Sequence, residues 1–246
     1  MPLSSGDIIL VDYSIFVKGT GELVETTSEA IAKLHRKYRE GEIYEPEVVI
    51  LGEGRLVRGF EEALMNAEIG KEYEIEVPPE KAYGERDSSK IKTYSRRLFL
   101  KSNIIPEIGK EVRINDQVGR IIAVESGRVV VDFNHPLAGK TLIIKFKVLK
   151  RIEDLSEKIK YLLKRRLKQL DINKVKVEIK EGKVLIELPK EFRLADGIQL
   201  IKLLTSRDII RWVKDINEVS FIDRFSKSEF EGGGSEQSES EETAGG

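Results

Sequence analysis

Residues 54–61 read GRLVRGFE and continue as EALMNAEIG at 62–70, and this stretch decides the fold. Its apolar residues fall at i, i+3, i+4 and i+7, on one face of a helix: Phe60, Ala63, Leu64 and Ala67. Gly70 lies where a C-terminal cap of that helix is expected. Upstream, VVIL at 48–51 predicts a brief strand that ends at a glycine turn. The stretch therefore predicts a strand, a turn and one amphipathic helix.

Further strands are expected on both sides of this helix. Residues 8–17 (IILVDYSIFV) are rich in β-branched and aromatic side chains, and residues 72–77 (EYEIEV) alternate strictly. Residues 141–149 (TLIIKFKVL) place Ile144 on an apolar face with every second residue. A charged segment at 29–40 predicts a short helix or an ordered excursion. This mixture indicates an α+β fold.

Two more regions differ from this pattern. Residues 85–137 form a separate β-rich unit, with short strands expected at 111–114, 118–124 and 128–133. From residue 153 an amphipathic helix, a hairpin around Glu181-Gly182, a second helix near 195–214 and a strand near 216–222 follow. This α-β-β-α-β order predicts a small α+β domain of its own.

Composition excludes several classes of site. The 246 residues carry 42 Lys and Arg against 43 Asp and Glu, so no net charge draws the whole chain to DNA or to an acidic membrane. Without cysteine there is no disulfide or thiolate chemistry, and only His35 and His135 offer imidazole. No run of 18 apolar residues exists, and the N-terminus lacks a signal-peptide layout. We therefore expect no metal, no membrane contact, no DNA binding and a cytoplasmic location.

Six short blocks occur in a set order along the first part of the chain: VDY at 11–13, GELVETT at 21–27, GRLVRGFE at 54–61, IGK at 69–71, PPEKAYG at 78–84 and NHPLAGK at 134–140. As an ordered set they resemble the FKBP family of peptidyl-prolyl cis/trans isomerases, specifically its SlyD-like branch. The extra segment begins directly after Gly84, where that branch carries its insert-in-flap domain. Residues 153–223 resemble the additional C-terminal domain of long archaeal members.

The resemblance implies a domain organisation. A half-barrel antiparallel sheet wrapped on one helix is expected in 1–85 plus 136–152, with the insert-in-flap domain at 86–135. A C-terminal α+β domain is expected at 153–226. Residues 227–246 are mostly Gly, Ser and Glu, which bury too little apolar surface to offset ordering, so a disordered tail is expected.

Rotation about an X-Pro bond has a barrier of about 20 kcal/mol, because the planar amide is stabilised by resonance. The twisted transition state loses part of the amide dipole, so a dry apolar pocket favours it over the planar form. The reaction needs neither a nucleophile nor a proton transfer, and no cofactor is expected. Such a site requires aromatic and aliphatic walls with one or two hydrogen-bond donors.

The resemblance to the family implies which residues form the pocket, position by position. The first strand supplies a tyrosine, the turn an apolar residue and an acid, and the helix start an aromatic floor. Val57 supplies a backbone N–H and Tyr83 a hydroxyl to hold the substrate. The implied set is Tyr13, Val24, Glu25, Leu56, Val57, Phe60, Tyr83 and Ile144. Three of these depart from the common pattern: Glu25 replaces Asp, Phe60 replaces Trp, and Ile144 stands where an aromatic is common.

In the family the insert binds unfolded chains, which requires apolar residues exposed beyond those that form its own core. The expected lining is Leu98, Phe99, Leu100, Ile104 and Ile105. Some of these residues are equally compatible with the core of the insert.

The resulting function is a peptidyl-prolyl isomerase with chaperone activity, whose partners are unfolded or proline-containing polypeptides. A macrolide inhibitor is a candidate ligand of the same pocket. One alternative is a non-catalytic holdase, which the departures at Glu25 and Ile144 favour. Another is a ribosome-associated folding factor that uses the basic residues of 158–168, although such a run is more often a solvated helix face.

Overall fold

The computed structural model describes residues 2–227 and 229 and divides into two compact units, 1–151 and 152–246. Apart from residues 227 and 229, the tail expected to be disordered lies outside the described residues. Within the described part, no helix combines the length and the apolar character needed to cross a membrane.

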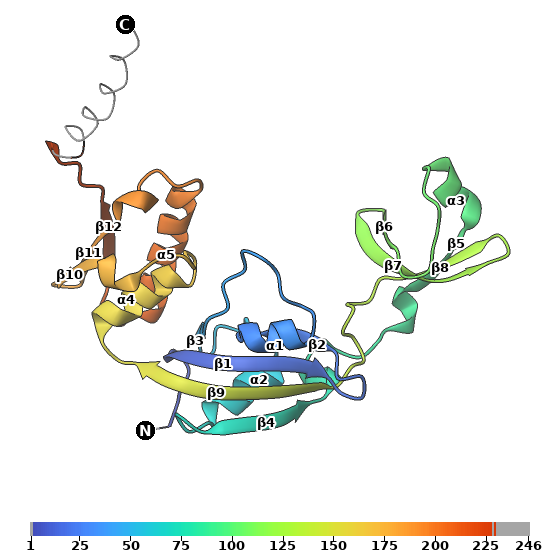
Figure 1. Cartoon of the computed structure of the whole chain (residues 1–246), viewed down its shortest axis with the longest axis horizontal. Coiled ribbons are helices and arrows are strands. Elements are labelled where there is room, and N and C mark those ends of the chain that lie inside the picture. Colours follow the sequence, from blue (N-terminus) through green and yellow to red (C-terminus); the bar gives the residue numbers. More distant parts are fainter. Residues whose placement is uncertain (1, 228, 230–246) are drawn as a thin grey trace, which may run out of the picture. The chain divides into compact units, whose positions relative to one another are not determined.

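A five-stranded sheet forms the frame of the first unit (Figure 1). Its strands follow the order β2-β1-β9-β4, and β3 pairs with β1. Their bounds are β1 (Ile8–Val17), β2 (Leu23–Thr26), β3 (Glu47–Ile50), β4 (Glu72–Val77) and β9 (Leu142–Ile152). Every second residue of β9 from Leu142 to Val148 is buried, which confirms the alternation read from the sequence. The antiparallel α+β class is likewise confirmed.

Helix α2 (Arg58–Met65) packs against this sheet through Phe60 and Leu64, which are completely buried. Gly59 permits this contact, because a Cβ there would lie 2.5 Å from Val77 Cγ1. The expected cap at Gly70 is wrong: the helix ends at Met65, and Asn66 is its C-cap. The amides of residues 66 and 67 bond three residues back, which tightens and closes the last turn.

Shorter elements complete this part of the unit. Helix α1 (Glu29–Leu34) begins at Ser28, whose hydroxyl accepts a hydrogen bond from the Ile31 amide. The expected helix over 29–40 is therefore shorter than predicted. A single 3-10 turn, η1 (Pro79–Lys81), follows β4 and leads to Tyr83.

The insert folds around a second, separate core. Its elements are η2 (Ser88–Lys90), β5 (Ile91–Ser95), α3 (Arg96–Lys101), β6 (Glu111–Ile114), β7 (Gln117–Glu125) and β8 (Arg128–Asp132). The strands pair antiparallel in the order β5-β8-β7-β6. Its fully buried residues are Phe99, Val112, Ile121, Val129 and Val131. Strand β5 and helix α3 were not anticipated from the sequence.

The second unit has the predicted α-β-β-α-β order. Its elements are α4 (Leu155–Lys164), η3 (Ile172–Lys174), β10 (Lys176–Lys180), β11 (Lys183–Glu187), η4 (Lys190–Phe192), α5 (Ile198–Trp212) and β12 (Glu218–Ile222). Glu181 and Gly182 both have positive φ, as the tight hairpin turn between β10 and β11 requires. Strand β12 returns parallel to β11, after the α5 crossover.

Candidate active site

Two strands and one helix bring aromatic and aliphatic side chains together in the first unit. Tyr13 of β1, Phe60 of α2 and Ile144 of β9 are buried in one apolar cluster. The Tyr13 and Phe60 rings meet edge-to-face at 5.5 Å, and Phe60 meets Phe146 at 5.2 Å. Edge-to-face contact is a favoured geometry for aromatic pairs, so these rings hold one another in place.

The other apolar candidates pack against the same cluster and remain partly open to solvent. They are Val24 of β2, Leu56 and Val57 before α2, and Tyr83 after η1. Glu25, which is exposed, joins them through the Tyr13 hydroxyl, 2.9 Å from its Oε1. The structure thus brings all eight residues of the implied set to one region, although they come from five separate segments.

Glu47 is a member of this region that the sequence did not reveal. Its Oε2 lies 2.5 Å from the Tyr13 hydroxyl. The residue begins β3 opposite Val11, and Val11 shares a strand face with Tyr13, so the register of the two strands directs the carboxylate to the phenol. A phenol has a single proton, so Tyr13 donates to only one of Glu25 and Glu47 at a time.

Replacing Tyr13 by phenylalanine should reduce the amount by which the free energy of unfolding falls at alkaline pH. Burial raises the pKa of the Tyr13 hydroxyl above its usual 10, and the charges of Glu47 and Glu25 raise it further. Such a group contributes stability that is complete below the unfolded-state pKa and is lost as the pH rises above it. Above pH 10 the wild type should therefore lose up to about 1.4 kcal/mol more per pH unit than Tyr13→Phe. Denaturant titrations between about pH 8 and 11 measure this, and parallel slopes would contradict it.

Two hydrogen-bond donors next to the cluster have no acceptor within the part of the chain that the structure describes. Val57 is the N-cap of α2, and its carbonyl accepts bonds from the amides of Phe60 and Glu61. Its own N–H has no acceptor among the described residues, as is usual at the start of a helix. The Tyr83 hydroxyl is equally without a partner in the described part of the chain. Both donors are therefore available to a ligand.

Tyr83 is held in place from two sides. The amide of the next residue, Gly84, donates to the Pro79 carbonyl at 2.7 Å and closes the turn after β4. The Tyr83 ring lies parallel to the His135 ring, with centroids 4.3 Å apart. Partial burial and the charge of Glu25 raise the pKa of Tyr83, so its hydroxyl keeps its proton, and its donor capacity, at neutral pH.

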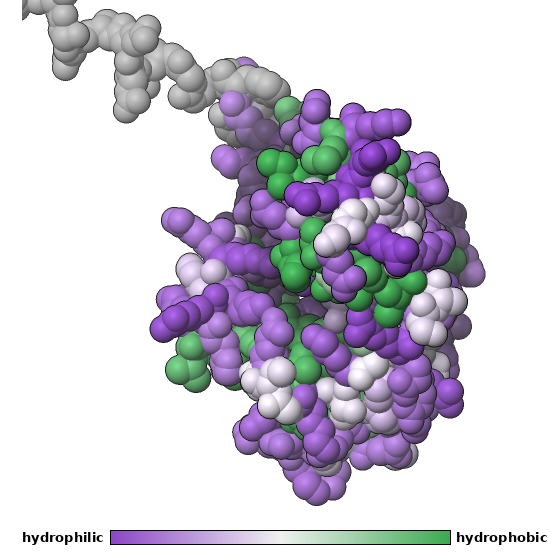
Figure 2. Space-filling model, turned by 90° about the vertical axis from the view of Figure 1, so that its right-hand side faces the viewer, coloured by the Kyte–Doolittle hydropathy of each residue, from purple (hydrophilic) through white to green (hydrophobic). Residues whose placement is uncertain are grey.

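The insert exposes part of the expected binding set and buries another part. Leu98, Leu100 and Ile105 are exposed, the last two by 51% and 63%, and Ile104 is half-buried. Phe99 is only 2% exposed and belongs to the core of the insert, so its assignment to a binding surface is corrected. Three exposed apolar residues of the insert were missed: Ile108, Val118 and Ile122. Figure 2 shows hydrophobic residues scattered between hydrophilic ones on the face that it draws.

Comparisons with known proteins agree with this geometry. A family model described as FKBP-type peptidyl-prolyl cis-trans isomerase matches residues 2–100. Models for the IF domain and the C-terminal part of FKBP26 match residues 97–137 and 155–226. A short-type peptidyl-prolyl cis-trans isomerase of Methanocaldococcus jannaschii is 37% identical over 146 residues, which cover 59% of this chain and 92% of the relative.

The chain belongs to the FKBP-type peptidyl-prolyl cis-trans isomerase family. It is an enzyme of the isomerase class, as the curated relatives are. SlyD of Helicobacter pylori is 32% identical over 145 residues, covering 57% of this chain and 70% of the relative. The 16 kDa FKBP-type isomerase of Escherichia coli is 29% identical over 140 residues, covering 52% of this chain and 93% of the relative. In this FKBP chain the segments matched by the family models include β1 to β4, α2 and the insert, whereas β9 lies between the matched ranges.

Proposed function

We propose that X-Pro bonds rotate against the apolar wall formed by Tyr13, Phe60 and Ile144, and that the Val57 amide and the Tyr83 hydroxyl anchor the substrate. The observation that carries the proposal is the pairing of a buried apolar wall with two donors that have no acceptor among the described residues. Backbone amides and hydroxyls that are not yet paired can hold a peptide carbonyl without losing an existing hydrogen bond.

The wall accounts for the acceleration. Water stabilises the planar, polar amide more than the twisted one, so contact with apolar side chains lowers the barrier. Phe60 and Ile144 have no polar atoms, and Tyr13 directs its hydroxyl to Glu25 and Glu47. The face presented to a prolyl ring is therefore apolar, while the donors fix the carbonyl beside it.

Replacing Tyr83 by phenylalanine tests the anchoring role. Losing one net hydrogen bond of about 0.5–1.5 kcal/mol should lower kcat/KM for a proline-containing tetrapeptide by about twofold to tenfold. The matched control is Tyr94→Phe, a half-buried tyrosine of the insert that packs on Phe99 and Phe133. A protease-coupled assay measures both variants. Full activity in Tyr83→Phe would refute the role of this hydroxyl.

We also propose that the insert binds unfolded polypeptides through its exposed apolar residues, so that the enzyme acts as a chaperone. Helix α3 and the loop after it expose Leu98, Leu100, Ile105 and Ile108, and β7 adds Val118. An apolar surface in excess of what the core needs is typical of a binding site. The arginine and lysine residues between them would keep bound chains soluble without selecting one sequence.

Finer partners follow from the same surfaces. A macrolide inhibitor would compete with substrate at the wall of Tyr13 and Phe60. The ribosome contact has less support, because two of the basic residues in 158–168 have partners inside the second unit. Arg166 is ion-paired with Asp208, and Lys164 donates to the Lys168 carbonyl. A cytoplasmic location stays a prediction.

A further inference from the structure

The closest ring contact among the described residues joins Tyr83 to His135. Their centroids are 4.3 Å apart and the planes differ by 5°. The two residues lie 52 positions apart in the sequence, on the segments that enter and leave the insert. We name residues 82–90 the entry linker and residues 133–140 the exit linker. This stack is therefore a contact between the two linkers.

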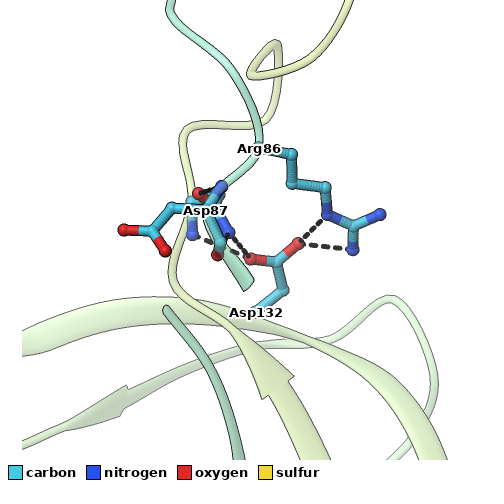
Figure 3. Close-up of polar contacts among 4 residues, drawn as sticks. Arg86, Asp87 and Asp132 are labelled. Carbon is cyan, nitrogen blue, oxygen red and sulfur yellow. Dashed lines mark hydrogen bonds and ion pairs between the residues drawn. The ribbon is translucent and has the colours of Figure 1, made fainter. Parts of the chain in front are cut away.

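Polar contacts close to the stack bond the entry linker to the exit linker and to the last residue of β8 (Figure 3). The Arg86 guanidinium holds Asp132 at 2.7 and 3.0 Å. The Asp87 amide donates to Asn134 Oδ1 at 2.9 Å, and Asn134 Nδ2 donates back to the Asp87 carbonyl at 2.9 Å. We call these four residues the linker clamp.

The contacts of Asp132 in this clamp favour its ionised form. Burial alone would raise the pKa of its carboxyl, but hydrogen bonds from Asn134 and the charge of Arg86 outweigh burial and lower it. Asp132 is thus ionised at neutral pH, and its Oδ2 accepts two charge-assisted hydrogen bonds from Arg86. The Gly139 amide also donates to the Gly84 carbonyl, directly after Tyr83, at 2.8 Å. Hydrogen bonds at Gly84 and at Asp87 therefore join the two linkers close to the stack.

The imidazole of His135 is itself oriented by a turn. Its Nδ1 accepts a hydrogen bond from the Leu137 amide at 3.2 Å, and its carbonyl accepts from the Ala138 amide at 2.9 Å. An Nδ1 that accepts carries no proton, so the neutral ring is protonated on Nε2. The turn sets the plane of the imidazole, and the imidazole sets the plane of the Tyr83 ring.

We propose that His135 is a positioning residue for the isomerase reaction: it stacks on Tyr83 and holds the hydroxyl ready for the substrate. The proposal rests on the proposed function of Tyr83. A half-exposed tyrosine without a ring partner exchanges between rotamers, and only a fraction of the molecules then has the hydroxyl in the productive place. A favourable aromatic stack raises that fraction by about twofold to tenfold.

Three substitutions of His135 distinguish the effect of its ring stack from the effect of its hydrogen bond in the turn. His135→Ala removes both the ring and the Nδ1 acceptor. His135→Phe keeps a ring and loses the acceptor, whereas His135→Asn keeps an acceptor and loses the ring. With a tetrapeptide substrate too short to engage the insert, we expect His135→Ala and His135→Asn to lower kcat/KM by about twofold to tenfold. The kcat/KM of His135→Phe should stay within about twofold of the wild-type value.

The other histidine of the chain is the matched control. His35 follows α1 and contacts the Phe16 ring at 5.3 Å and 58°, and neither residue belongs to the apolar cluster of the candidate active site. His35→Ala should leave kcat/KM unchanged. The unfolding free energy of each variant, measured by denaturant titration, identifies any loss of activity that comes from loss of fold.

A double variant tests the coupling directly. In the Tyr83→Phe background there is no hydroxyl left to position, so His135→Ala should cause no further loss of kcat/KM. If His135→Ala lowers kcat/KM further in the Tyr83→Phe background, the proposal is overturned. It is also overturned if His135→Asn preserves activity and His135→Phe does not. Full activity in Tyr83→Phe alone would instead refute the proposed role of Tyr83, so the two failures are distinguishable.

Discussion

Replacing Phe60 by alanine should cost about 3–5 kcal/mol of unfolding free energy and remove most of the isomerase activity. Phe60 is completely buried, and its ring contacts both Tyr13 and Phe146. Truncation would leave a cavity where the aromatic floor lies. Because the ring is completely buried, part of the lost activity would come from lost stability of the fold.

Two further variants separate the effect of lost fold stability from the effect of losing the Phe60 ring in the site. Leu64→Ala lies one turn along the same face of α2, is equally buried, and should cost about 2–5 kcal/mol. It removes no residue of the proposed wall, so its kcat/KM should stay near the wild-type value at temperatures where it is folded. Phe60→Leu, which costs less stability, should still lower kcat/KM. Equal activity in Phe60→Leu and wild type would contradict a role for the ring in catalysis.

Excising the insert should depress catalysed refolding of a proline-limited protein by about tenfold or more. In the proposed role, the insert tethers an unfolded chain near the site, which would raise the effective concentration of its prolines. The same excision should change kcat/KM for a tetrapeptide by less than about threefold, because a tetrapeptide gains nothing from tethering. Comparable losses on both substrates would contradict this division of labour.

The structure shows where to cut. The Phe133 amide donates to the Lys90 carbonyl at 3.0 Å, so these two residues lie side by side at the base of the insert. Replacing residues 91–131 by a short glycine-containing turn keeps all four clamp residues, Arg86, Asp87, Asp132 and Asn134, and leaves His135 in place.

A surface variant provides the control for excision. Serine at Leu100 and Ile105, both exposed, should weaken catalysed refolding without unfolding the insert. Serine at the buried Phe99 should unfold it, since a hydroxyl would enter the core without a partner. If the exposed pair can be replaced without any effect on refolding, another surface of the chain binds the client.

Much of the framework could be predicted from local pattern. Residues 8–17 and 72–77 form strands at the predicted bounds, because strict alternation or a β-branched run is itself the condition for a half-buried strand. The buried face of α2 was also correct, while its end at Met65 was not. Helix ends depend on hydrogen bonds and contacts outside the helix, which sequence periodicity does not encode.

In the insert, by contrast, local pattern predicted less of the structure. The sequence leaves LFL at 98–100 compatible with a binding surface and with the core of the insert. In the structure RRLFLK at 96–101 forms α3, which buries Phe99 and exposes Leu98 and Leu100. A six-residue segment with three neighbouring apolar residues has no clear period, so the side that faces the core is settled by the sheet against which it packs.

The ordered blocks in the sequence determined the family, the reaction class and the residue types of the candidate site, because each block carries a local backbone requirement or an apolar face. Only the tertiary structure decided which of those residues meet. Glu47 reaches Tyr13 through the register of β3 on β1, and His135 reaches Tyr83 through the two linkers of the insert. Such contacts join segments far apart in the chain, and no local preference of either segment specifies its partner.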